Sequence, residues 1–408
     1  MSDVALDTAP AGPSADRRLR VVHVITTLTT GGAERQLEWL TSHTAHEPHV
    51  IALYGAGAVG ESIERAGVPV QVLGMDGWRK ALAVPRLARA IRRLRPDVVH
   101  VHLLSGQLWG IPAARLAGVR TVVSTEHSLM DASIENRPLT ERLRRLYLAL
   151  ARMATRTVAV SPTTRDRLIG WGVPADRITV IDNGIDFDVL AYSADGRRRV
   201  RAELGIEPGT VVLGAVGRLE PVKRFPQLLD AVAEGLRPGV LELVIAGDGP
   251  LRSSLLRQAE TLGVADAVHL LGPRPDVPDV LSAMDMLISP SRDETFGMAV
   301  IEGLGSGLPV AYAQCPALDR LARTPAWAIA LSGPADPVDV ADPEAEAIRA
   351  AVGRLPARRG AAANATPVRH PVPPVLIDAY GISATSAALD RLYTQLRGAA
   401  AATAAAER

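Results

Sequence analysis

The chain has 408 residues, more than the roughly 250 to 300 at which one hydrophobic core usually stops growing, and so predicts two domains. Hydrophobic residues make up 47% and charged residues 22%, a composition that excludes a globally disordered chain. The formal net charge is +1, so no overall field attracts nucleic acid and no nucleic-acid partner is expected. The single cysteine, Cys315, excludes an internal disulfide. With no long apolar run, it predicts a cytoplasmic location.

The first half of the chain alternates between strand-like and helix-like segments. Residues 1–18 are polar and are expected to form a disordered leader. A β-branched run, a Thr and Gly turn and helical spacing of apolar residues then follow one another. The expected strands are 20–28, 68–73, 97–104 and 120–127, and the expected helices are 33–43, 81–94 and 107–117. This alternation predicts an α/β domain with a mainly parallel sheet over residues 19–190.

A polar, turn-rich stretch places the domain boundary at about 190–205, after which the alternation restarts. Strands are expected at 210–219, 241–247, 267–272 and 286–290, with helices from Pro226 and Pro250 and around 297–305. A second α/β domain is therefore predicted over residues 205–376. Its 333–376 end is expected to be mostly loops around a helix at 345–355. The closing helix at 384–398 is expected to complete the first domain.

Residues 291–310, SRDETFGMAVIEGLGSGLPV, place two glutamates around the start of a helix. Eight helical steps of ~1.5 Å separate Glu294 and Glu302 by about 12 Å at most. The N–H groups of Phe296, Gly297 and Met298 are free to bind an anion at the helix start, and the carboxylates can accept hydrogen bonds from hydroxyls. A sugar, a diphosphate and a ribose present these groups in that order. The alternative is a capping glutamate and a solvated one.

Residues 214–225, GAVGRLEPVKRF, place Arg218 and Lys223 in a short loop between a buried strand and a helix. A departing nucleotide diphosphate gains negative charge as the glycosidic bond breaks. Fixed cations beside it therefore stabilise the transition state more than the ground state. A pair of surface basic residues is the alternative interpretation.

These motifs in their joint order resemble glycosyltransferase family 4, over nearly the whole chain. The other matching segments are TTGGAERQL (29–37), DVVHVH (97–102), STEHS (124–128), VAVSPTTRDRL (158–168), VIDNGIDFD (180–188), VIAGDGPLRSSL (244–255) and HLLG (269–272). The resemblance implies the GT-B fold, in which two Rossmann-like domains with parallel sheets face each other across a cleft. The first domain would bind the acceptor and the second the nucleotide-sugar donor.

The resemblance also implies roles for the matching residues. Arg218 and Lys223 would hold the donor diphosphate, Glu302 the ribose hydroxyls and Glu294 the transferred sugar. His127 would face the reacting sugar, with an ordinary strand-end histidine as the alternative. The remaining expected donor contacts are Gly31, Gly32 and Gly247 beside the phosphates and nucleotide, for which a tight turn or a helix cap is the alternative.

No metal and no cofactor are predicted, and a nucleotide-diphosphate sugar enters as co-substrate. His100 and His102 point to one face of a strand, as a metal pair would. However, no third ligand is spaced nearby in the sequence, and the family uses no metal. Asp186 and Asp188 imitate a two-carboxylate metal motif, but this segment in the family leads into the interdomain link.

The function implied is transfer of a hexose, with retention of configuration, to a glycan or lipid-linked acceptor in cell-surface polysaccharide synthesis. One alternative is a sugar-nucleotide-binding relative without turnover, motivated by residues 311–376. There Cys315, Pro316 and Asp319 occupy a region where the family has a Gly-Gly turn and an acid. A second is a sugar-nucleotide epimerase of the same fold. A nicotinamide oxidoreductase is disfavoured because neither first strand is followed by Gly-x-Gly-x-x-Gly.

Two basic stretches leave peripheral membrane contact open. Residues 79–96 have seven cations and no acid, and residues 141–156 have five cations and one acid. An amphipathic basic helix can rest on an anionic membrane, here the inner face of the cell membrane. A solvated helix face is the alternative.

Overall fold

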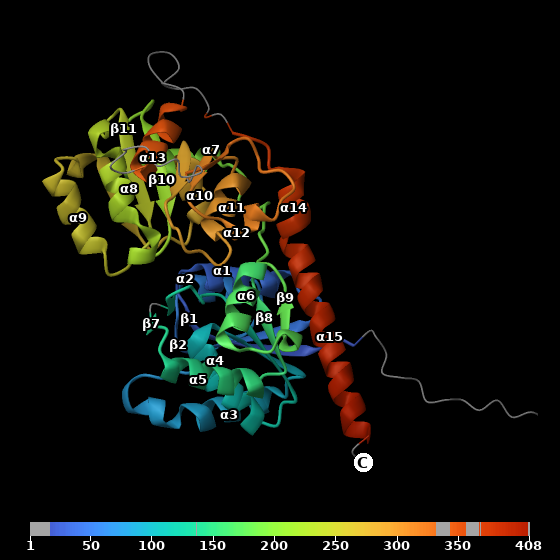
Figure 1. The fold of residues 1–408 in the computed structure, drawn as a ribbon. Helices are drawn as coiled ribbons and strands as arrows, with labels where there is room; N and C mark the ends of the chain where they lie inside the picture. Colours follow the sequence, from blue (N-terminus) through green and yellow to red (C-terminus); the bar gives the residue numbers. More distant parts are fainter. Residues whose placement is uncertain (1–16, 136, 332–342, 356–366, 368, 407–408) are drawn as a thin grey trace, which may run out of the picture.

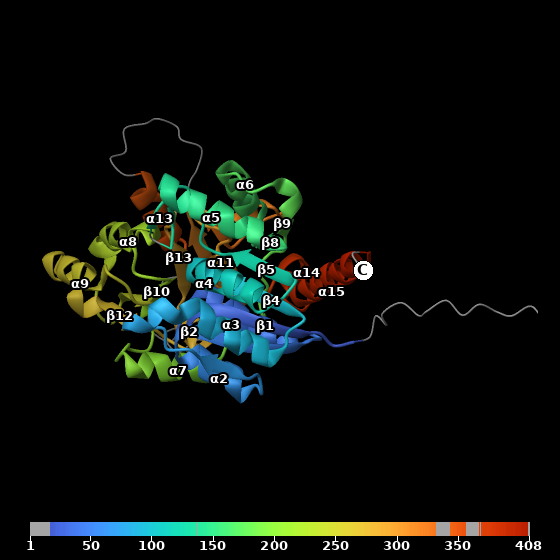
Figure 2. The same cartoon turned by 90° about the horizontal axis from the view of Figure 1, so that it is seen from below.

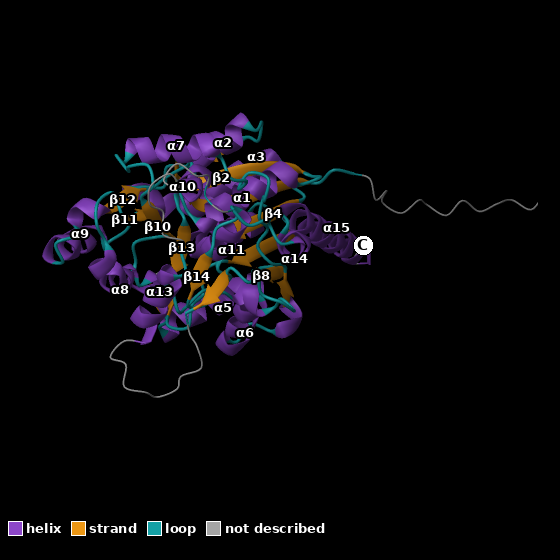
Figure 3. Ribbon diagram, turned by 90° about the horizontal axis from the view of Figure 1, so that it is seen from above, coloured by secondary structure: helices purple, strands orange, loops and turns teal. Residues whose placement is uncertain are grey.

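The computed structural model describes residues 17–135, 137–331, 343–355, 367 and 369–406. These residues form two lobes, each built on one parallel sheet, stacked one above the other (Figure 1). Helices surround the strands of both lobes (Figure 3). The predicted α/β architecture with two parallel sheets is therefore confirmed.

The N-terminal sheet has seven parallel strands in the order β3-β2-β1-β4-β5-β8-β9. The strands are β1 (Arg20–Leu28), β2 (Glu47–Ala56), β3 (Val70–Val72), β4 (Val98–His102), β5 (Thr121–Glu126), β8 (Arg156–Ala159) and β9 (Ile178–Val180). An antiparallel pair, β6 (Ser133–Ile134) and β7 (Arg137–Pro138), lies outside it. The helices are α1 (Gly32–His43), α2 (Ala58–Arg65), α3 (Ala83–Leu94), α4 (Leu103–Leu116), α5 (Glu141–Met153) and α6 (Pro162–Trp171).

Side chains alternate between the two faces of this sheet, so each face has its own core. Val22, Val24, Val99 and Val101 pack under α3 and α4. The opposite face carries Val98, under residues of α1 and of the C-terminal helix.

The C-terminal sheet has six parallel strands in the order β12-β11-β10-β13-β14-β15. The strands are β10 (Val211–Val216), β11 (Leu241–Ala246), β12 (Val268–Gly272), β13 (Met286–Ser289), β14 (Val310–Tyr312) and β15 (Ala328–Ala330). The helices are α7 (Ala194–Glu203), α8 (Phe225–Val232), α9 (Arg252–Thr261), α10 (Val277–Ala283), α11 (Met298–Gly305), α12 (Pro316–Asp319), α13 (Pro343–Gly353), α14 (Pro374–Tyr380) and α15 (Ile382–Ala406). Among residues 333–376, the predicted helix at 345–355 corresponds to α13, and parts of that stretch lie outside the described residues.

Several elements were missed from the sequence, among them β2 and α7. The strand β2 lies beside β1, and its four central residues are buried, so it lacks the alternation of a half-buried strand. The stretch interpreted as a turn-rich boundary contains α7, whose N-terminus is capped by the Ser193 hydroxyl. Arg197 and Arg201 fix this helix to the C-terminal domain by bonding the carboxylate of Asp285 at 2.9 and 2.7 Å.

The chain crosses between the domains twice at one place. The Ile185 N–H donates to the Tyr380 carbonyl at 2.7 Å, and the Ile382 N–H donates to the Ile185 carbonyl at 2.9 Å. From this crossing α15 runs down the side of the N-terminal lobe (Figure 1). Its Asp390 accepts a bond from Thr44 at 2.7 Å, and its Tyr393 hydroxyl shares a 2.6 Å bond with His100.

The described helices include none that combines the length and apolar character needed to span a bilayer.

Replacing Tyr393 with Phe is expected to lower the free energy of unfolding by about 1 to 3 kcal/mol. The variant leaves a buried nitrogen of His100 without its hydroxyl partner. Urea unfolding followed by circular dichroism measures the change. Thr394→Ala, one residue further along the same helix and exposed, is the control and should stay within ~0.5 kcal/mol of wild type. Equal midpoints for Tyr393→Phe and wild type would contradict the role given to this bond.

Candidate active site

The carboxyl ends of β10 and β13 carry the charged residues singled out in the sequence. Arg218 and Lys223 lie in the loop after β10, and Glu294 lies in the loop after β13. The Lys223 ammonium donates to the Glu294 carboxylate at 2.6 Å, and Arg218 pairs with Glu220 at 2.8 Å. The cation predicted to hold a phosphate and the acid predicted to hold a sugar are therefore direct neighbours.

Glycines allow two loops to approach closely beside this pair. Gly247 has a φ of 141°, and a Cβ there would overlap the carbonyl oxygen of Gly217. Gly247 thus has a packing role under the Arg218 loop.

The start of α11 presents unpaired backbone donors. Among the described residues, no acceptor lies opposite the N–H groups of Phe296, Gly297 and Met298. Gly297 has a φ of 95°, which favours glycine, and a Cβ there would press against Cys315. The side chain of Phe296 is buried against Tyr380, so only its backbone can face a ligand. This helix start is therefore suited to an anion.

The loop that departs from the family pattern supports the Glu294 loop directly. Gln314 accepts a bond from the Glu294 N–H at 2.9 Å. Cys315 is buried behind Phe296 and Gly297, and burial raises the pKa of its thiol to about 12. The thiol is therefore protonated at neutral pH and acts in packing.

Glu302 lies on α11, facing α1 of the other domain. Burial raises the pKa of its carboxyl to about 7, and the nearby charge of Arg35 opposes this shift. Among the described residues, no hydrogen-bond partner is found for this carboxylate. Arg35 also donates to the carbonyl of Pro275 across the domains at 3.2 Å. A pair of ribose hydroxyls fits a carboxylate of this kind.

The N-terminal domain contributes its Gly31–Gly32 turn to the same region. A Cβ on Gly32 would lie 3.8 Å from the Met298 side chain, which puts this turn directly against the start of α11. Burial raises the pKa of the Glu34 carboxyl, while hydrogen bonds and the charge of Arg218 oppose the shift. Glu34 of the N-terminal domain therefore lies within electrostatic reach of Arg218 of the C-terminal domain.

His127 follows β5 and faces the Glu294 loop. Its carbonyl accepts a bond from the Thr295 hydroxyl at 2.9 Å, and its ring nitrogen Nε2 lies 3.3 Å from His102 Nδ1. Burial lowers the pKa of the His127 imidazole to about 4, so the ring is neutral at pH 7. The fully buried Glu126 fixes the loop by accepting bonds from Ser128 N–H and from Tyr147 hydroxyl, both at 2.8 Å.

Sequence spacing offered no third ligand for His100 and His102, but the fold brings a third histidine to them. His23 on β1 lies beside them, and the three residues offer ring nitrogens within 4.8 Å of one another. His23 and His102 share a 3.1 Å bond, and His100 bonds the hydroxyls of Tyr393 and Thr125 at 2.6 Å each. These hydrogen bonds give the buried ring nitrogens partners, so the three histidines form a buried polar network.

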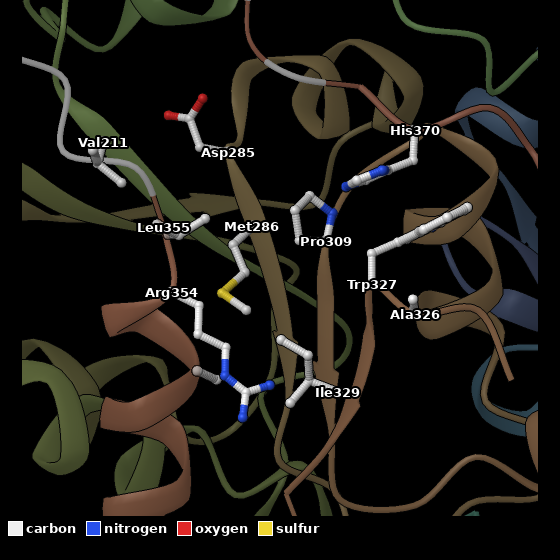
Figure 4. Close-up of a pocket in the computed structure, with 11 residues that line it drawn as sticks. Val211, Asp285, Met286, Pro309, Ala326, Trp327, Ile329, Arg354, Leu355 and His370 are labelled. Atoms are coloured by element: carbon white, nitrogen blue, oxygen red, sulfur yellow. The ribbon is translucent and has the colours of Figure 1, made fainter.

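A cavity of about 360 Å³ lies elsewhere, between the C-terminal sheet and α13 (Figure 4). It is lined by Val211, Met286, Pro309, Trp327 and Arg354, among others. The first four lie at or before the amino ends of strands β10, β13, β14 and β15. Ligands of open parallel sheets bind at the carboxyl ends, so this cavity is separate from the candidate active site.

The structure brings predicted residues of both domains together where the domains contact each other. Glu34, Arg35 and Arg167 lie in the matching sequence motifs, but no role was predicted for them. They stood next to the Gly pair and in VAVSPTTRDRL, and charged side chains inside matching motifs were the available signal.

Family models, related sequences and solved structures match this chain. Residues 30–189 match the Glycosyltransferase Family 4 model, and residues 196–323 match the Glycosyl transferases group 1 model. A D-inositol 3-phosphate glycosyltransferase of Thermobispora bispora is 29% identical over 425 residues, which cover 96% of this chain and 92% of that protein. A 2-deoxystreptamine N-acetyl-D-glucosaminyltransferase of Streptomyces fradiae is 30% identical over 317 residues, covering 69% and 74%. The crystal structure of Anabaena Alr3699/HepE in complex with UDP and glucose shares the fold, with a TM-score of 0.74, 21% identity and coverage of 93% and 100%.

Fold and similarity together define a nucleotide-sugar-dependent glycosyltransferase with the GT-B fold. The chain belongs to glycosyltransferase family 4, as its motifs predicted.

Nucleotide affinity is expected to rise with pH through about 7, by up to about tenfold between pH 6 and pH 8. If Glu302 binds the ribose as predicted, its carboxyl is protonated below the raised pKa and lacks charge-assisted bonds to the ribose hydroxyls, and above that pKa the carboxylate forms them. Calorimetry with a nucleoside diphosphate measures this. Because the terminal phosphate also titrates in this range, Glu302→Gln is the matched reference. Parallel pH profiles for both proteins would refute the assignment.

Proposed function

We propose that this enzyme transfers a hexose from a nucleotide-diphosphate sugar to a glycan or lipid-linked acceptor, with retention of configuration, in cell-surface glycan assembly. The supporting observation is the convergence of Lys223, Glu294 and the free N–H groups of α11 opposite His127. Cations and dipoles for a leaving diphosphate thus lie beside an acid for the sugar.

In the proposed reaction, the bond between the anomeric carbon and the diphosphate oxygen breaks, and the electron pair leaves with the diphosphate. The acceptor oxygen bonds to the anomeric carbon on the same face, and its proton passes to the leaving phosphate oxygen. Arg218, Lys223 and the start of α11 stabilise the developing charge. Lys223 would turn from Glu294 toward the phosphate, which frees the Glu294 carboxylate for sugar hydroxyls.

The neutral imidazole of His127 would orient the sugar from the N-terminal side. Its Nε2 is occupied by His102, so Nδ1 is the nitrogen left for a sugar hydroxyl. Closure of the two domains would exclude water that would otherwise hydrolyse the donor.

Donor and acceptor identity call for a panel of candidates. A structural neighbour contains UDP and glucose, so uridine donors are tested first. The two relatives are named for D-inositol 3-phosphate and 2-deoxystreptamine. Both compounds are therefore tested as acceptors, together with glycans and lipid-linked sugars.

Lys223→Ala and Glu294→Ala are each expected to lower kcat/KM about 100- to 1000-fold, since each removes a charged group at the reacting bond. Nucleotide release with and without acceptor measures turnover. Arg257→Ala, an exposed residue on α9, is the control and should keep wild-type rates.

The same assay separates the rival functions. A non-catalytic sugar-nucleotide binder would bind the donor and release no nucleotide. An epimerase would convert the donor sugar without any acceptor. Full activity of both alanine variants would refute the proposed site.

We further propose that the enzyme works in the cytoplasm and rests on an anionic membrane through its N-terminal domain. Helices α3 and α5 lie at the end of this domain away from the C-terminal one (Figure 1), and Figure 2 views that end. The exposed stripe of α5 carries Arg142, Arg145 and Arg152 together with Leu146 and Met153, which are 42% and 38% exposed. Such a mixed basic and apolar face suits a headgroup region.

Arg142→Ala/Arg152→Ala is expected to weaken binding to vesicles with anionic lipid roughly 30-fold, since each arginine near the surface contributes ~1 kcal/mol. Sedimentation with vesicles measures this, and neutral vesicles should bind neither protein. Arg257→Ala/Arg349→Ala removes the same charge from exposed helices of the C-terminal domain and serves as the control. Equal vesicle binding by both double variants would refute membrane contact through α5.

A further inference from the structure

The loop that carries Glu294 is bound by the opposite domain at each of its residues 293–295. Arg167, on α6 of the N-terminal domain, donates to the Asp293 carboxylate at 2.7 Å and to the Glu294 carbonyl at 3.2 Å. The Ser161 hydroxyl donates to the Thr295 carbonyl at 2.5 Å. The Thr295 hydroxyl in turn donates to the His127 carbonyl.

Arg167 is the residue that joins the two sides of this contact. Its other bonds stay inside the N-terminal domain, to the Leu129 carbonyl at 3.2 Å and the Asp131 carboxylate at 2.8 Å. Its side chain is only 12% exposed, whereas that of Asp131 is 76% exposed. The planar guanidinium thus satisfies acceptors of both domains in one fixed geometry.

From these contacts we infer that Arg167 is a positioning residue that couples closure of the two domains to the placement of Glu294. This inference rests on the proposed function. The Glu294 backbone is fixed from two sides, with its N–H on Gln314 of its own domain and its carbonyl on Arg167 of the other. Separating the domains would remove the second support and leave the first.

The consequence is a conformational bias toward the closed form. Two of the four acceptors of Arg167 are present only when the domains meet, so the residue stabilises the closed form over the open one. The diphosphate contacts of Arg218, Lys223 and α11 all belong to the C-terminal domain. Loss of Arg167 should therefore spare nucleoside diphosphate affinity and impair sugar transfer.

The test compares Arg167→Ala and Asp293→Asn with Asp131→Asn. Arg167→Ala removes the interdomain ion pair and Asp293→Asn removes its negative charge, whereas Asp131→Asn removes the negative charge of the exposed pair within one domain. We expect Arg167→Ala and Asp293→Asn to lower kcat about 10- to 100-fold, because a small misplacement of a sugar contact costs that much. Affinity for UDP, or for the nucleoside diphosphate that the panel selects, should stay within about twofold of wild type, and Asp131→Asn should keep wild-type kcat.

Two further measurements distinguish positioning from general structural damage. The loss of kcat in the Arg167→Ala/Asp293→Asn double variant should be smaller than the two single losses combined, because both changes remove the shared Arg167–Asp293 interaction. The ratio of donor hydrolysis to transfer should rise in the interdomain variants. If Arg167→Ala does not fold in a thermal unfolding assay, Asp293→Asn, at a site 24% exposed, tests the same contact.

A wild-type kcat for Asp293→Asn, an equal loss in Asp131→Asn, or a loss of diphosphate affinity as large as the loss of kcat would overturn the inference. Absence of any transfer by the wild-type protein would instead overturn the proposed function, while diphosphate binding remains measurable.

Discussion

The double crossing of the chain at Ile185 and Tyr380–Ile382 is the constraint on which the arrangement of this enzyme depends. Two backbone hydrogen bonds tie the outgoing and returning segments together, and a Cβ on Gly184 would press against Ile382. The hydrophobic core around this point is continuous from α11 and α14 to α15 and the N-terminal sheet. The loops at the carboxyl ends of both sheets consequently contact each other.

Where these loops meet, basic side chains are paired with acidic ones. Lys223 pairs with Glu294, and Arg218 pairs with Glu220 and lies within electrostatic reach of Glu34. A buried charge without a partner is costly, so a cation placed for a diphosphate also needs an acid close by. Glu294, the acid predicted to hold the sugar, lies next to Lys223, the cation predicted to hold the diphosphate, so the same two residues meet both requirements.

The buried histidines of the N-terminal domain serve as hydrogen-bond partners for one another. His23, His102 and His127 are linked ring to ring, and burial lowers the pKa of each, so these rings are neutral. A neutral imidazole both donates and accepts a hydrogen bond. The buried rings can therefore bond one another in a chain that ends at His127. Hydrogen bonds among neutral rings thus orient His127, the ring that is predicted to face the sugar.

Local patterns determined the α/β class and the parallel sheets. They also determined that a helix begins after Gly297 and how far apart Glu294 and Glu302 lie along the chain, because these features depend on residues close in sequence. The strand β2 was not predicted because it is buried on both faces and so lacks the alternation of apolar and polar residues. Helix α7 was not predicted because its polar sequence is stabilised by Asp285, more than 80 residues away. Tertiary structure alone decided that Lys223 meets Glu294, 71 residues on, that His23 completes a histidine cluster, and that Arg167 reaches Asp293 in the other domain. Such pairings follow from how two domains pack, and the periodicity of the chain does not encode which distant side chains will meet.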